Sequence, residues 1–191
     1  VGIKANSKVD IQSSKDGKVS GNVIISSDLD ADGKNQTVVF AGDKLSIQGA
    51  NTTLDNASLA YQEVKFYNDG VTGTNNLTIA NNSSFTPINA EGSIIKDSDI
   101  NIETNGNITF DNAITQKAGY RLAIDPKAND DGTIDARQFE AKSKTRQDAV
   151  NLNVKSTENN ITVQNGSDLA ASRDINMKAE AGNYTQQSKD A

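Results

Sequence analysis

The chain has 191 residues, and its 19 basic and 25 acidic side chains give a net charge of −6. It contains no histidine and no cysteine, which excludes Ser-His-Asp catalysis, thiol nucleophiles, disulfides and metal sites built on imidazole or thiolate. No basic stripe accompanies the acidic charge, and no apolar run approaches the ~18 residues of a membrane helix, so we expect neither nucleic-acid binding nor membrane insertion.

Short strands are predicted along most of the chain. Apolar and polar residues alternate in nine triplets, at 9–11, 45–47, 64–66, 77–79, 100–102, 108–110, 152–154, 161–163 and 175–177. This period of two is typical of strands with one buried face. The 23 Asn and 14 Gly, against two Pro, favour tight corners between the strands. Residues 136–150 could instead form a helix on propensity.

The spacing of the strands bears on the architecture. Strands recur every 6–10 residues, and equivalent strands recur about every 19–23 residues. A β-sandwich also places its strands ~8–12 residues apart, so it remains the alternative. Strands of three to five residues joined by Asn, Gly and Asp corners favour an all-β fold whose rungs stack, a right-handed parallel β-helix over 1–191 as a single domain. The rhythm breaks at 116–150, which we interpret as an insertion outside the coil.

Three segments carry a resemblance to a known family. Residues 165–182 read NGSDLAASRDINMKAEAG, and looser copies occur at 42–50, GDKLSIQGA, and 106–113, GNITFDNA. They resemble the rung repeat of filamentous-haemagglutinin-like exoproteins of the two-partner secretion pathway. The resemblance implies a β-helical fragment that is secreted to the bacterial surface, with the outer-membrane transporter of the parent chain as a partner during export. The Asn-Pro-Asn-Gly-type signals of the family's secretion domain are missing, which favours an internal or carboxy-terminal piece.

Asn-x-Ser/Thr sequons are in excess. Chance placement predicts roughly four on background usage, and ten occur, at Asn35, Asn51, Asn56, Asn76, Asn81, Asn82, Asn107, Asn160, Asn165 and Asn183. One interpretation is strand alternation, in which outward Asn and Thr flank an inward apolar residue, as at 76, 107 and 160. The other is glycosylation, because the high-molecular-weight adhesins that the chain resembles are glucosylated on such sequons before export.

One acidic loop partly matches a calcium motif. Asp28, Asp30 and Asp32, followed by Gly33, have the spacing of an EF-hand loop, but Val39 stands where the bidentate Glu is required. A weak Ca²⁺ site at these three carboxylates competes with an acidic turn. The second acidic run, 129–135, has Lys127 at the first ligand position and favours a turn.

The functional prediction is attachment, with no catalytic residues. Three of the four Arg fall within 116–150, and a guanidinium pairs well with the carboxylate of a sialylated glycan. We therefore predict a glycan site at Tyr120, Arg121, Arg137 and Arg146, on a loop carried by a rigid coil. The simpler interpretation is that these Arg balance Asp125, Asp135 and Glu140. The alternative function is a shaft without a ligand, as in contact-dependent growth-inhibition exoproteins.

Overall fold

The fold is a three-sided coil of short parallel strands. The computed structural model describes residues 1–28, 37–67, 70–93, 95, 98–113, 117–118 and 151–188. These residues form strands and turns with no helix among them, and so none in this part of the chain that could cross a bilayer. All strand pairs are parallel except one hairpin, β3 (Ser14–Lys15) with β4 (Lys18–Val19). The parallel β-helix is confirmed and the β-sandwich is wrong.

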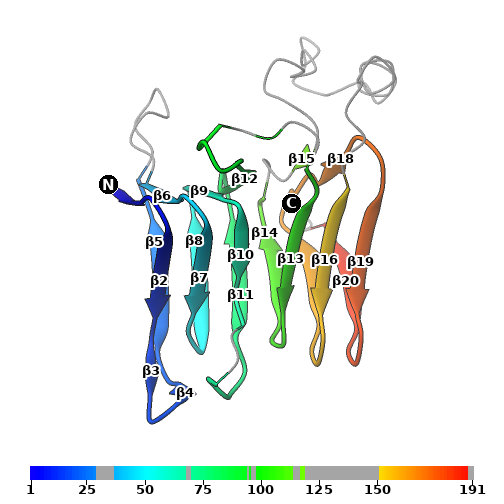
Figure 1. Ribbon diagram of the computed structural model, residues 1–191. Coiled ribbons are helices and arrows are strands. Elements are labelled where there is room, and N and C mark those ends of the chain that lie inside the picture. Colours follow the sequence, from blue (N-terminus) through cyan, green and yellow to red (C-terminus); the bar gives the residue numbers. More distant parts are fainter. Residues whose placement is uncertain are drawn as a thin grey trace.

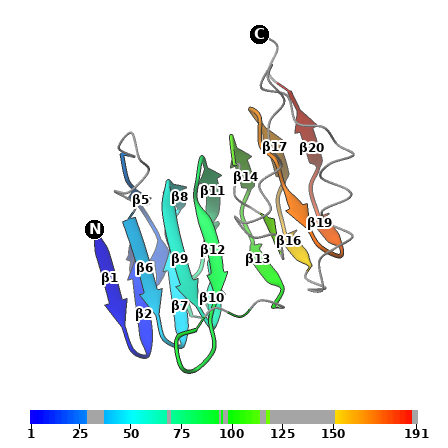
Figure 2. The same cartoon turned by 90° about the horizontal axis from the view of Figure 1, so that it is seen from above.

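Each rung gives one strand to each side of the coil, and successive rungs lie side by side from the amino-terminal to the carboxy-terminal end (Figures 1 and 2). The first side contains β1 (Gly2–Ala5), β6 (Thr37–Ala41), β9 (Ala57–Tyr61) and β12 (Ser84–Pro87), in that order, and further along the coil a second pair, β15 (Lys117–Ala118) with β18 (Ala170–Ala171). The second side contains β2 (Lys8–Gln12), β7 (Lys44–Gln48) and β10 (Glu63–Lys65), then β13 (Ile100–Thr104), β16 (Leu152–Ser156) and β19 (Ile175–Ala179).

The third side is an unbroken six-stranded parallel sheet. Its members are β5 (Asn22–Ser26), β8 (Asn51–Asp55), β11 (Asn76–Ala80), β14 (Ile108–Asp111), β17 (Ile161–Gln164) and β20 (Tyr184–Gln187). This sheet runs the length of the coil, so it fixes how each rung sits on the next.

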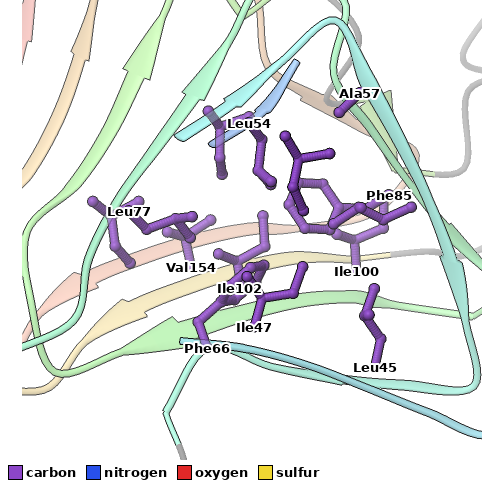
Figure 3. Close-up of a cluster of buried hydrophobic side chains, with 14 of the residues drawn as sticks. Leu45, Ile47, Leu54, Ala57, Phe66, Leu77, Phe85, Ile100, Ile102 and Val154 are labelled. Carbon is purple, nitrogen blue, oxygen red and sulfur yellow. The ribbon is translucent and has the colours of Figure 1, made fainter. Parts of the chain in front are cut away.

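Alternation along each strand builds the core. On the third side, Ile108 stacks between Leu77 and Ile161, and all three are buried. Figure 3 shows side chains from the three sides meeting inside the coil, among them Leu45, Leu54 and Phe85. Burying a Leu, Ile or Phe side chain contributes about 1.5–3 kcal/mol, so these inward columns are the main stabilising term.

Asparagine makes the corner that follows the third side. Asn56, Asn81, Asn112 and Asn165 directly follow β8, β11, β14 and β17, and each has a φ between 51° and 56°. Asn adopts this left-handed conformation at lower cost than other residues with a side chain. The surplus of Asn in the sequence predicted tight corners between strands. The structure has such a corner after the third side in four successive rungs.

Four of the five steps between rungs are longer than the predicted 19–23 residues, and the last one falls within that range. Stacked asparagines at the start of the third side are separated by 29, 25, 31, 53 and 23 residues in successive rungs. The first of these includes residues 27–36, which join β5 to β6. The step from Asn107 to Asn160 is 30 residues longer than the step from Asn160 to Asn183. The strands of the third side nevertheless pair in the same register across both steps.

The long rung contains the predicted insertion. Lys117 and Ala118 pair in parallel with Ala170 and Ala171, so the coil extends beyond the predicted boundary at 116. Residues 119–150, with the stretch considered as a helix, lie outside the described residues. The coil resumes at Asn151 and β16 in register with β13.

Candidate functional site

A column of six asparagines runs along the outside of the third side. Asn22, Asn51, Asn76, Asn107, Asn160 and Asn183 occupy the same position in successive rungs, at the start of the strand or one residue before it. Five of the six are predicted sequons, because all but Asn22 are followed two residues later by Thr. We call these six residues the asparagine ladder.

Hydrogen bonds connect every step of the ladder. In the first two steps, side-chain amides donate to the preceding side chain: Asn51 Nδ2 to Asn22 Oδ1 at 3.2 Å and Asn76 Nδ2 to Asn51 Oδ1 at 3.3 Å. In the later three steps the backbone N–H donates instead, from Asn107 to Asn76 Oδ1 at 2.9 Å, from Asn160 to Asn107 Oδ1 at 3.1 Å and from Asn183 to Asn160 Oδ1 at 2.8 Å. In these three steps the asparagine Oδ1 therefore satisfies a corner N–H group that lies outside the sheet pairing.

A threonine column accompanies the asparagine ladder. Thr53, Thr78, Thr109, Thr162 and Thr185 lie in register on neighbouring strands, two residues after each sequon asparagine. Residues two apart on a strand point to the same face, so the asparagine and threonine columns both face outward. The residue between them in each strand points inward. Stacking of one rung pattern thus accounts for five of the ten sequons, two more than alternation alone predicted.

The other described sequons lie at the following corner. Asn56, Asn81 and Asn165 are three of its left-handed residues, and Asn82 follows Asn81. Asn81 Nδ2 donates to Asp55 Oδ1 at 2.6 Å, and Asn165 Nδ2 donates to Asp111 Oδ1 at 2.6 Å. Asn56 Nδ2 donates to the Ser27 carbonyl at 3.2 Å. Backbone geometry and capping thus explain Asn at these positions without modification.

The sequons differ in whether the side-chain nitrogen of the asparagine, Nδ2, donates a hydrogen bond. Nδ2 donates a hydrogen bond in Asn51, Asn56, Asn76, Asn81, Asn82 and Asn165. In Asn107 and Asn160 the backbone N–H and Oδ1 form the ladder bonds, and in Asn183 the backbone N–H alone does, so that Nδ2 of these three donates to no described residue. An Asn-linked sugar is attached to Nδ2, so these three sequons could carry one and keep the ladder bonds. Asn35 lies outside the described residues.

The other predicted sites fall largely where the structure gives no description. Tyr120, Arg121, Arg137 and Arg146 all lie outside the described residues, as do Asp30 and Asp32. Asp28 is the last residue described before that gap. Within the described ranges no group of three acidic side chains is close enough to hold a metal ion. The glycan and calcium sites therefore stay predictions.

Sequence reasoning missed a hollow at the corner between the second and third sides. It has a volume of about 360 Å³ and is lined by parts of three successive rungs: the connection from β10 to β11, Asn105 and Glu158. A signal was present in the sequence, because residues 70–74 read GVTGT between two predicted strands, and such a Gly-rich link exposes backbone.

Comparisons with protein-family models, curated proteins and solved structures found no match for this chain.

Proposed function

We propose that this chain is a section of a bacterial surface adhesin, secreted by the two-partner route, whose coil holds an attachment segment outside its sides. The observation that carries the proposal is the 53-residue step between Asn107 and Asn160, next to a 23-residue step between Asn160 and Asn183. The ladder bond is the same in both steps. A rigid scaffold that absorbs 30 extra residues without losing register is suited to presenting a binding loop.

The composition of the extra chain supports a glycan ligand. Tyr120, Arg121, Arg137 and Arg146 fall within 119–150, and Arg173 is the only other Arg in the chain. Guanidinium groups bind carboxylates through paired, charge-assisted hydrogen bonds, and an aromatic ring contacts the apolar face of a sugar. We therefore propose a sialylated host-cell glycan as the ligand and attachment, without catalysis, as the activity.

A glycan array with the purified chain tests the proposal. We expect selective binding to sialylated glycans and its loss in the triple variant Arg121→Ala, Arg137→Ala, Arg146→Ala. Arg173→Ala is the matched control, since among the described residues its guanidinium makes one exposed 3.6 Å ion pair, with Asp174. Equal binding by the triple variant and the parent would rule the Arg site out.

The asparagine ladder favours a second candidate, a spacer. Continuous stacking through six strands of the third side makes a stiff rod that needs no ligand, as in the shaft of a contact-dependent growth-inhibition exoprotein. A blank array from a chain that is folded by circular dichroism would favour the spacer.

A further inference from the structure

The hollow between the second and third sides is built from three successive rungs. The connection from β10 to β11 supplies Tyr67 and residues 70–74, the turn after β13 supplies Asn105, and the turn after β16 supplies Glu158. In Figure 1 this connection descends below β10 and β11 toward the hairpin β3–β4. The volume of about 360 Å³ lies within the range of small-ligand sites.

Asn105 gives the hollow a fixed wall. It is 8% exposed, its Nδ2 donates to the Gly73 carbonyl at 2.8 Å, and its Oδ1 accepts from the Asn75 N–H at 2.9 Å. Asn159 Nδ2 donates to the Asn105 carbonyl at 2.8 Å. Since these bonds link all three rungs, the wall is formed before any ligand arrives.

The hairpin β3–β4 braces the opposite wall. The Val19 N–H donates to the Thr72 carbonyl at 3.0 Å, and the Thr72 N–H donates to the Gly17 carbonyl at 2.9 Å. Gly73 has a φ of 105°, and an added Cβ there would approach Val19 Cγ2 to 2.8 Å. The wall over 70–74 therefore needs glycine both for its backbone conformation and for its contact with the hairpin.

Three polar side chains in the hollow are not engaged by any residue that the structure describes. The Tyr67 hydroxyl, the Thr74 hydroxyl and the Glu158 carboxylate make no hydrogen bond or ion pair with any described residue, and the Tyr67 residue is 46% exposed. By contrast, both the nitrogen and the oxygen of the Asn105 side-chain amide form hydrogen bonds within the fold. A preformed polar wall stands beside hydroxyls and a carboxylate that no described residue engages and beside a half-exposed aromatic ring, and this combination suits a polar ligand.

We propose that this hollow binds one uncharged pyranose residue of a glycan. The apolar face of the sugar would lie against the Tyr67 ring, and its hydroxyls would donate to the Glu158 carboxylate and exchange hydrogen bonds with Thr74. The Glu158 carboxylate in the lining disfavours an acidic sugar in this hollow. This site differs in residues and in ligand charge from the proposed Arg site and does not depend on it.

The test is a titration of the ¹⁵N-labelled chain with the methyl glycosides of glucose, galactose, mannose and N-acetylglucosamine. We expect saturable backbone amide shifts confined to residues 70–74, 105 and 158, with a Kd for at least one sugar of about 1–10 mM, an affinity typical of weak single-residue recognition. Tyr67→Ala and Glu158→Gln should each weaken this binding at least about fivefold, a loss of about 1 kcal/mol.

Matched controls separate the site from general effects. Tyr184 is as exposed as Tyr67, at 46%, and lies on the last rung, so Tyr184→Ala should bind like the parent. Glu91→Gln removes one exposed carboxylate from the connection after β12 and should also have no effect. The triple Arg variant should keep full binding, so failure of the Arg site and failure of this site are distinguishable.

Three results would overturn the proposal. One is the absence of saturable shifts for all four glycosides at about 50 mM, well above the expected Kd. Another is binding that is unchanged in both Tyr67→Ala and Glu158→Gln. The third is saturable binding of tetramethylammonium in the hollow with no binding of sugars, which would make the Tyr67 and Glu158 pair a cation site.

Discussion

The side chain of Tyr61 is buried inside the coil, although it ends in a polar hydroxyl group. The residue is 4% exposed, and its hydroxyl has no hydrogen-bond partner among the described residues. The ring packs edge-on against Phe85, with centroids 6.4 Å apart and planes at 75°. Burial raises the pKa of Tyr61, because the phenolate would lose its hydration. The folded coil therefore requires the neutral phenol.

Tyr61→Phe should stabilise the protein. It keeps the edge-on contact and removes a buried unpaired hydroxyl, so we expect the free energy of unfolding to rise by about 1 kcal/mol at neutral pH. An unfolded Tyr ionises near pH 10 and the folded one only above that, so the parent loses stability as the pH rises beyond about 10. Urea denaturation from pH 7 to 11 should show a smaller alkaline loss in the variant. A less stable variant at pH 7 would contradict this.

Gly106 has no room for a side chain. An added Cβ would overlap the carbonyl of Asn75 and approach the Asn76 nitrogen to 2.7 Å, and all of these are backbone atoms of the preceding rung. We expect Gly106→Ala to lower the free energy of unfolding by about 2–3 kcal/mol, because the rungs must separate to admit the methyl group. Gly2→Ala is the control, since no atom lies within 4 Å of its added Cβ. Equal stability of the two variants would argue against this close approach.

At the scale of the element, mutation can distinguish the stabilising effect of the asparagine ladder from the mere presence of a sequon. Asn107 Oδ1 accepts the Asn160 N–H, so Asn107→Ala leaves that N–H without its acceptor and should cost about 1 kcal/mol. Thr109→Ala abolishes the same sequon but removes no hydrogen bond to a described residue. Thermal unfolding of both variants should therefore show a loss in the first alone. Equal losses would assign the stability to the sequon's Thr column and not to the ladder.

The strands were predictable from local pattern, and their stacking was not. Each apolar triplet lies on a strand, except that Phe66 falls just beyond β10 and is still buried inside the coil. Which asparagine stacks on which depends on the length of every excursion between them, and steps of 31 and 53 residues hide the repeat from a search at fixed period. The hollow escaped prediction for the same reason, because its walls come from corners of three different rungs.

At the scale of the whole molecule, the long rung can be shortened to match its neighbour. In the last rung only Ser172, Arg173 and Asp174 join β18 to β19, and Asn151 aligns with Asp174. Replacing residues 119–150 with Ser-Arg removes 32 residues and adds two, so the step from Asn107 to Asn160 falls from 53 to 23 residues, as in the next rung. The coil should then close without distortion.

We expect this shortened chain to keep its β-type circular dichroism and to unfold at a temperature within a few degrees of the parent, since loop length changes stability only weakly. Glycan binding by the Arg site should disappear, while binding of an uncharged sugar in the hollow should remain. Loss of the folded spectrum would mean that residues 119–150 are needed by the coil itself.

The ladder also determines how the rod would respond to force. Backbone bonds between parallel neighbours and the asparagine bonds beside them both run along the coil axis, so tension between the ends is carried by all rung interfaces in series, and we expect them to rupture one after another. A rung of 23 residues releases about 80 Å of chain at ~3.5 Å per residue, whereas the rung of 53 residues releases about 185 Å. Stretching one molecule should thus give a series of short extensions interrupted by one long extension. That long extension would mark the rung that contains residues 119–150.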